Sequence, residues 1–365
     1  MNEIPSLSVS AIVEKLAAAY SKLIKGGVPL KNFPSVMLWG APGVGKSQAI
    51  RQVAEKLKSE TGKNVAVTDV RLLLFNPIDL RGIPTANADK TLAVWLKPKI
   101  FDMDESENTV NILFLDEISA APQSVQAAAY QITLDRVVGE HRLPDNCIVV
   151  AAGNRVTDKS VAYKMPRALA NRLMHLGVDV KFESWREWAM QSGINDRVLG
   201  FLSYRPDLLI EEPKNPDELA YPSPRSWEMV SNILNYAESD PSKAFDLVAG
   251  VIGTGCAVEF RNWCKVYAIL PSMEDIFAGK NPPVPAATDV LFALVSSMAV
   301  YARERKNDMK LLQNSIRYAL RFPADFSALL MRDYMSIEKG FKERLMLIPE
   351  FYEWLRTKGR FLNGN

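Results

Sequence analysis

The chain has 365 residues, of which 48% are hydrophobic, and its 44 basic and 42 acidic residues give a formal net charge of +2. This length exceeds what one hydrophobic core usually serves, so we expect two or three domains, and the balanced charge gives no electrostatic reason to expect a nucleic-acid partner. Three cysteines and two histidines indicate neither a disulfide framework nor a zinc site, and the absence of a long apolar run or a leader pattern predicts a cytoplasmic protein without a membrane partner.

The first predicted elements lead to a loop with recognisable chemistry. Residues 1–30 contain an amphipathic helix with Ile12 and Leu16 on its apolar side. A short apolar strand follows at 36–39, and after the loop a second helix carries an apolar stripe that includes Ile50. This order of strand, loop and helix is the context in which a phosphate-binding loop is expected.

The loop itself matches the spacing of a P-loop, which wraps the phosphates of a nucleoside triphosphate. Its glycines permit backbone angles that turn successive N–H groups toward phosphate oxygens, at the positive end of the next helix. We expect Lys46 to reach the β and γ phosphates and Ser47 to bind Mg²⁺. The predicted nucleotide-binding residues are Gly40, Ala41, Pro42, Gly43, Val44, Gly45, Lys46 and Ser47.

A second strand, at 111–116, runs through apolar residues and ends at two carboxylates. Ligands of a parallel sheet bind at the carboxyl ends of its strands. We therefore expect Asp116 to bind Mg²⁺ through water and Glu117 to polarise the attacking water. Taken alone, such a pair could equally be a solvated strand end, and it is the P-loop upstream that favours the catalytic interpretation.

Further strands are predicted at 65–70, 148–152 and 178–180, which gives a parallel sheet of five strands with helices on both faces. Asn154 follows the strand at 148–152, where its amide could orient the water or contact the γ phosphate. The alternative is a turn-forming Gly-Asn pair.

The motifs together resemble the AAA+ ATPases, and the MoxR branch in particular, over roughly residues 5–235. The resemblance is carried by the P-loop, by Phe114 to Glu117, by Ala152 to Arg155 and by the segment from Met165 to Leu173. In addition, residues 76–84 resemble the start of an insertion in the second helix of the core, and residues 138–143 resemble a hairpin inserted before the asparagine-bearing strand.

The resemblance also implies roles for three arginines. An arginine of the segment 165–173 would reach the γ phosphate held by a neighbouring subunit, and we choose Arg172, with Arg167 as the second choice. The alternative is an ordinary basic helix end. Arg225, in the run Ser-Pro-Arg-Ser-Trp, would be a sensor at the start of a lid helix, although Ser223 and the following proline also form a normal helix start.

Beyond about residue 183 the pattern is almost wholly helical. We expect an α/β nucleotide-binding core with its N-terminal helix at 1–205, an α-helical lid at 206–305 and a helical C-terminal extension at 306–365. Long helices are predicted at 289–303 and 310–320, and the sequence does not assign their function.

The resemblance implies an ATPase with ATP and Mg²⁺ as cofactors that acts as a chaperone-like remodeller of partner proteins. It further implies a homo-hexamer and a protein client, with a von Willebrand factor A-domain protein as one possible partner. Two alternatives remain open, namely a motor stimulated by nucleic acid and a structural switch that binds ATP but hardly cleaves it. The near-zero net charge counts against the motor, and Glu117 counts against the switch.

Overall fold

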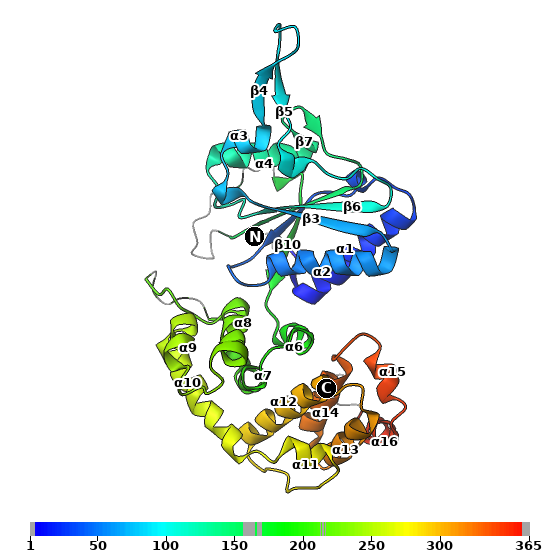
Figure 1. The fold of residues 1–365 in the computed structure, drawn as a ribbon, viewed down its shortest axis with the longest axis vertical. Helices are drawn as coiled ribbons and strands as arrows, with labels where there is room; N and C mark the ends of the chain where they lie inside the picture. The colour runs from blue at the N-terminus through cyan, green and yellow to red at the C-terminus, as the bar shows by residue number, and fades with distance from the viewer. Residues whose placement is uncertain are drawn as a thin grey trace. The chain divides into compact units, whose positions relative to one another are not determined.

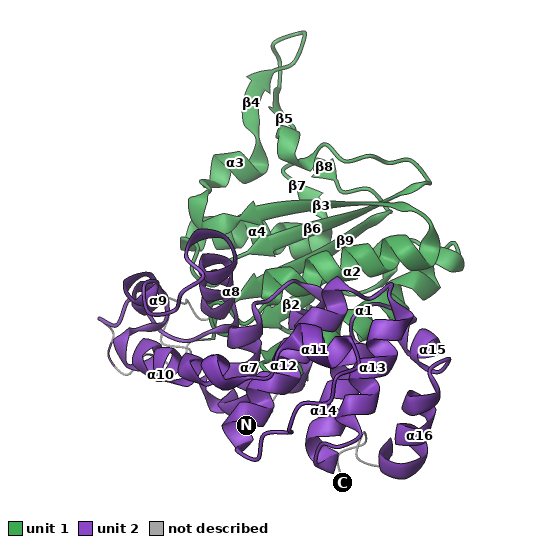
Figure 2. Cartoon of the chain, turned by 60° about the horizontal axis from the view of Figure 1, so that its bottom comes forward, with its two compact units in different colours: residues 1–180 green, residues 181–365 purple. Residues whose placement is uncertain are grey.

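The computed structural model describes residues 4–155, 165, 170–211, 213, 215 and 217–359. The chain divides into two compact units, Met1–Val180 and Lys181–Asn365, which Figure 2 distinguishes by colour. The first unit is an α/β domain and the second is helical in its described part.

A parallel sheet of six strands forms the centre of the first unit, in the order β1-β10-β2-β9-β6-β3. The predicted α/β class is confirmed, but the predicted count of five strands was one too low. The additional strand is β1, which was missed because three residues are too few to show a period, and it pairs with β10 at the edge of the sheet. The strands are β1 (Ser6–Ser8), β2 (Val36–Trp39), β3 (Asn64–Arg71), β6 (Thr109–Asp116), β9 (Cys147–Gly153) and β10 (Met174–Asp179).

Helices cover both faces of this sheet (Figure 1). Helices α1 (Val9–Lys25) and α2 (Lys46–Thr61) pack against each other on one face. The other face carries α3 (Pro77–Arg81) and α4 (Gln123–Asp135). The hydroxyl of Ser8 caps α1 by accepting a hydrogen bond from the N–H of Ala11, which explains why the chain changes from strand to helix at this point.

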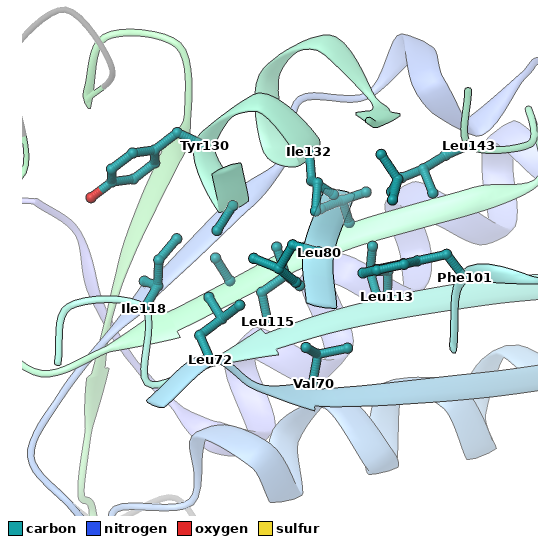
Figure 3. Close-up of a cluster of buried hydrophobic side chains, with 14 of the residues drawn as sticks. Val70, Leu72, Leu80, Phe101, Leu113, Leu115, Ile118, Tyr130, Ile132 and Leu143 are labelled. Carbon is teal, nitrogen blue, oxygen red and sulfur yellow. The ribbon is translucent and has the colours of Figure 1, made fainter. Parts of the chain in front are cut away.

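The core on the α4 face joins strands, helices and loops in one apolar cluster. Leu113 and Leu115 of β6 lie among Leu80 of α3, Ile132 of α4 and Ile118 of the loop after β6 (Figure 3). All five are at most 1% exposed. Because a close-packed core resists displacement of its members, this cluster holds the loop after β6 in a fixed place at the end of its strand.

Two antiparallel hairpins extend from the α4 side of this unit. Strands β4 (Ile83–Ala86) and β5 (Ala93–Leu96) form the first hairpin, and β7 (Val137–Val138) and β8 (His141–Arg142) form the second. The second matches the hairpin predicted at 138–143. The two hairpins are joined where the Nε2 atom of His141 lies 2.8 Å from the carbonyl oxygen of Trp95.

The described part of the second unit is mainly helical, as the pattern beyond residue 183 predicted. Its helices α12 (Thr288–Glu304) and α13 (Met309–Ala319) match the helices predicted at 289–303 and 310–320. By its contacts it begins at Lys181, so α6 and α7 group with it, whereas the functional division at residues 205 and 305 stays a prediction. Among the described residues no helix combines the length and apolar character that crossing a membrane requires. The α-helices among the described residues of this unit are α6 (Phe182–Gln191), α7 (Asp196–Tyr204), α8 (Pro224–Asn232), α9 (Phe245–Ile252), α10 (Thr254–Cys264), α11 (Met273–Phe277), α12 (Thr288–Glu304), α13 (Met309–Ala319), α14 (Ala324–Met335), α15 (Phe341–Leu345) and α16 (Pro349–Lys358).

Candidate active site

The loop 40–47 joins β2 to α2, in the predicted order of strand, loop and helix. Gly43 and Gly45 have φ angles of 78° and 99°, which side chains with a Cβ rarely adopt. At Gly40 the obstacle is space, because a Cβ there would lie 3.0 Å from a methyl group of Val44. Backbone conformation therefore favours glycine at two positions of the motif, and close packing favours it at the third.

The ammonium group of Lys46 points back over the loop. Its Nζ donates to the carbonyl oxygens of Gly40 and Ala41, at 2.6 and 2.9 Å, and to Oδ1 of Asn154 at 2.9 Å. Lys46 is only 9% exposed, so this cation is held in a restricted environment at the first turn of α2. The structure thus brings the predicted asparagine into contact with the predicted phosphate-binding lysine.

Ser47 and Asp116 meet at the ends of α2 and β6. The hydroxyl of Ser47 donates to Oδ2 of Asp116 at 3.0 Å, and Oδ1 of Asp116 accepts a hydrogen bond from the N–H of Glu117 at 2.9 Å. A hydroxyl oxygen and a carboxylate oxygen side by side are the ligands that Mg²⁺ prefers. These two residues fit the predicted magnesium site.

A further carboxylate, which the sequence interpretation overlooked, lies on the neighbouring strand. Asp69 of β3 pairs with Phe114 of β6, and Arg71, two residues later in β3, pairs with Asp116. Partial burial and the nearby Asp116 carboxylate raise the pKa of Asp69 above its ordinary value. Burial is the larger of these causes, and the negative charge of Asp116, which is the second, would also attract a cation. An acidic residue near the carboxyl end of a predicted strand was the signal available in the sequence.

Glu117 begins the turn after β6 in a left-handed conformation, with a φ of 59°. This conformation is uncommon for a residue other than glycine, and such residues concentrate at functional sites. It lets the chain reverse directly after the strand, so that Glu117 stays at the carboxyl edge of the sheet beside Asp116. The placement suits the predicted catalytic base.

Asn154 follows the last residue of β9, and Trp39 and Gly153 are paired at the ends of β2 and β9. The P-loop and Asn154 therefore start from the same level of the sheet. The N–H of Asn154 donates to the hydroxyl of Ser119 at 2.9 Å, while its side chain contacts Lys46. Among the described side chains of the predicted site there are two contacts around the loop, one between Lys46 and Asn154 and one between Ser47 and Asp116.

Arg172 lies in a turn just before β10 and is exposed, while the adjacent Leu173 is buried. The strand predicted at 178–180 in fact begins at Met174, so the chain turns into the sheet two residues after Arg172. Arg167 falls outside the described residues. The roles of both arginines stay predictions.

A histidine ties the Arg172 turn to the strand that precedes the P-loop. Nε2 of His175 lies 2.7 Å from the carbonyl oxygen of Ala170, and Nδ1 of the same ring accepts a hydrogen bond from the indole N–H of Trp39 at 2.9 Å. These partners specify the neutral ring with its proton on Nε2, because Nδ1 faces a donor and Nε2 faces an acceptor.

Arg225 is exposed in the first turn of α8, in the second unit. The expected helix start is present, because the hydroxyl of Ser223 accepts from the N–H of Ser226 and the hydroxyl of Ser226 accepts from the N–H of Ser223, at 3.1 and 2.6 Å. This capping accounts for the serines and for Pro224 but uses no atom of Arg225. The sensor role of Arg225 remains a prediction.

Comparison with known proteins adds a family assignment for the first unit. Residues 35–175 match the family described as "ATPase family associated with various cellular activities (AAA)". This range contains the P-loop, Asp116, Glu117 and Asn154. No curated protein sequence matches the chain.

Several solved structures resemble the chain at low sequence identity. A mutant form of RuvB from Thermotoga maritima is 17% identical, covers 83% of this chain and 87% of its own, and has a TM-score of 0.36. A DNA polymerase III gamma subunit-related protein from Thermotoga maritima is 13% identical, covers 94% of this chain and 99% of its own, and has a TM-score of 0.34. NtrX from Brucella abortus, solved in complex with ADP, is 14% identical, covers 94% of this chain and 68% of its own, and has a TM-score of 0.33.

The family match and the geometry of the loop lead to the same assignment. The match covers the strands and the loop that hold Lys46, Ser47, Asp116 and Asn154 together. Residues 35–175 of this chain are thus similar to ATPase domains of the AAA type, and the P-loop at 40–47 lies within the matched range.

Proposed function

We propose that this protein hydrolyses ATP with Mg²⁺ and uses the energy to remodel or activate partner proteins, in the manner of MoxR-type AAA+ ATPases. The observation that carries the hydrolytic part is that Lys46 contacts Asn154 and Ser47 contacts Asp116, both at the carboxyl edge of one sheet. The resemblance of the motifs to the MoxR branch supports the remodelling part.

The chain supplies a separate group for each need of phosphoryl transfer. The loop N–H groups and the amino end of α2 bind the phosphates, and Lys46 offers its positive charge to their outer oxygens. Ser47 and Asp116 would hold Mg²⁺, which neutralises charge on the β and γ phosphates.

Two further residues act on the attacking water. Glu117 accepts the proton that this water loses as its oxygen bonds to the γ phosphorus and the bond to the ADP oxygen breaks. The amide of Asn154 orients the water or contacts the γ phosphate, close to Lys46. Positioning and electrostatics thus account for the reaction without a covalent intermediate.

The proposed assembly is a ring, a homo-hexamer by resemblance, in which Arg172 reaches the nucleotide of the adjacent subunit. The exposure of Arg172 and the burial of the adjacent Leu173 support this role, because a side chain that projects from an anchored turn can reach a partner. Movement of the helical region against the α/β domain would then act on a client, with a von Willebrand factor A-domain protein as one candidate partner.

The first experiment tests hydrolysis. ATP turnover of the wild type is compared with Lys46→Ala, which we expect to lose nucleotide binding, and with Glu117→Gln, which we expect to bind ATP but to lose turnover. Turnover that survives both substitutions would exclude this site. Stimulation of turnover by DNA and by no protein would exclude the remodelling role.

The second experiment tests the shared site by mixing two inactive variants. Arg172→Ala has an intact Glu117, and Glu117→Gln has an intact Arg172. In a random equimolar ring about one quarter of the interfaces combine the two intact halves, so mixing should restore about one quarter of wild-type turnover. Arg142→Ala, which removes another exposed arginine of the same unit, is the control and should stay active. Full activity of Arg172→Ala alone, or no recovery on mixing, would refute the trans-acting arginine.

A further inference from the structure

The turn after Asp116 is fastened to the end of β9 by two hydrogen bonds. The N–H of Ile118 donates to the carbonyl oxygen of Ala152 at 3.0 Å, and the N–H of Asn154 donates to the hydroxyl of Ser119 at 2.9 Å. The first bond joins backbone to backbone. The second depends on one side chain, that of Ser119.

Glu117 belongs to the same hydrogen-bonded turn as Ser119. The carbonyl oxygen of Glu117 accepts hydrogen bonds from the N–H groups of Ala120 and Ala121, at 3.0 and 3.2 Å. The side chain of Ile118 is completely buried and lies in the core near Leu115 (Figure 3). Because the turn is closed by its own bonds and anchored in the core, the hydroxyl of Ser119 has a fixed position relative to Glu117.

The space around Ser119 is filled. Ser119 is 3% exposed, and a Cβ added to Gly153 would lie 2.8 Å from its hydroxyl oxygen and 2.9 Å from Cε of Met37. In addition, the buried amide of Gln126 donates to the carbonyl oxygens of Ser119 and Ala121, at 3.3 and 2.9 Å. The contact between Ser119 and Asn154 therefore has little freedom to shift.

We propose that Ser119 is a positioning residue of the ATPase site, whose hydroxyl fixes the backbone of Asn154 relative to Glu117. The inference rests on the proposed function, because only hydrolysis requires Glu117 and Asn154 to act on the same water and γ phosphate. Nucleotide binding relies on the loop and Lys46 and does not need this spacing. A small displacement of a positioned group can lower the rate of a reaction about a hundredfold.

Loss of the Ser119 hydroxyl should therefore lower kcat and leave nucleotide binding unchanged. In Ser119→Ala we expect kcat to fall by about tenfold or more, while the Kd for a fluorescent ATP analogue stays within about twofold. The matched control is Ser35→Ala, since Ser35 is also buried, bonds to a backbone carbonyl at 2.6 Å and lies at the opposite end of β2 from the P-loop.

A second pair of variants tests the same contact. Gly153→Ala presses on the hydroxyl of Ser119 and should also lower kcat with unchanged binding. Because both changes disturb one contact, the double variant Ser119→Ala, Gly153→Ala should lose less than the product of the two single losses.

The outcomes separate this inference from the proposed function. If wild-type turnover does not depend on Lys46 and Glu117, the proposed function fails. If it does depend on them and Ser119→Ala keeps its kcat, the positioning role of Ser119 fails alone. The positioning role also fails if Ser119→Ala lowers kcat, nucleotide binding and thermal stability together, and by the same amounts as Ser35→Ala.

Discussion

The ion pair between Arg186 of α6 and Asp333 of α14 offers a quantitative test of the helical unit. Nε and Nη2 of the arginine donate to the two carboxylate oxygens, at 2.8 and 2.6 Å, and the side chains are only 4% and 2% exposed. Asp333→Asn preserves the shape but leaves the guanidinium buried without its counter-charge. Breaking a buried pair in this way costs about 3 to 5 kcal/mol of unfolding free energy.

This cost predicts a large shift in thermal unfolding. The helical unit spans Lys181–Asn365, and in a domain of this size each 1 kcal/mol changes Tm by roughly 2 to 4 °C. Asp333→Asn should therefore lower the Tm of the helical transition by roughly 6 to 20 °C, measured by circular dichroism on the full chain.

Two controls identify the cause of that shift. Replacing both partners by apolar residues, Arg186→Met with Asp333→Leu, should recover most of the lost stability because no buried charge remains. Asp207→Asn breaks an ion pair with Arg205 whose side chains are 36% and 62% exposed, and should cost about 1 kcal/mol or less. An Asp333→Asn protein that melts within about 2 °C of the wild type, or a double variant as unstable as the single one, would refute this account.

Three smaller predictions concern the α/β unit. Gly45→Ala places a Cβ at a φ of 99° and should abolish ATP binding, so normal binding of a fluorescent analogue would contradict the loop geometry. Because burial and Asp116 raise the pKa of Asp69, the folded protein holds this proton more tightly than the unfolded chain does. The stability of the fold therefore falls as pH rises from the ordinary aspartate pKa through the raised one. Asp69→Asn should reduce this fall, and an unchanged pH dependence of Tm would contradict the prediction. Trp39→Phe removes the donor to His175 and should cost about 1 kcal/mol in urea unfolding, whereas no loss would show that this hydrogen bond is not stabilising.

Much of the α/β unit could be predicted because its signals are local. A few neighbouring residues are enough to predict each element and its polar end. This holds for the P-loop, for the apolar run before Asp116 and for the strand before Asn154. The rule that the carboxyl ends of parallel strands share one edge then brings these ends together. The contacts of Lys46 with Asn154 and of Ser47 with Asp116 agree with that reasoning.

The features that were missed depend on contacts between distant segments. Strand β1 has three residues and becomes a strand by pairing with β10, far along the chain. Ser119 looks like an ordinary small residue in a turn, and its contact with Asn154 exists only after β6 and β9 have paired. Arg225 shows the reverse case, because its local pattern predicted a helix start correctly without establishing what the arginine contacts.

The contacts of Lys46 link nucleotide binding to the side-chain conformation of Asn154. The ammonium group of Lys46 donates to the carbonyl oxygens of Gly40 and Ala41 and to the side chain of Asn154. A phosphate oxygen that accepts a hydrogen bond from Lys46 must therefore compete with these three acceptors. The two carbonyls belong to the backbone of the loop, whereas the amide of Asn154 can rotate about its side-chain bonds while its N–H stays on Ser119. Of the three acceptors, the Asn154 amide can therefore leave at the least cost, and it is the group predicted to act on the γ phosphate. Binding of the phosphate would thus release this amide at the place where hydrolysis requires it.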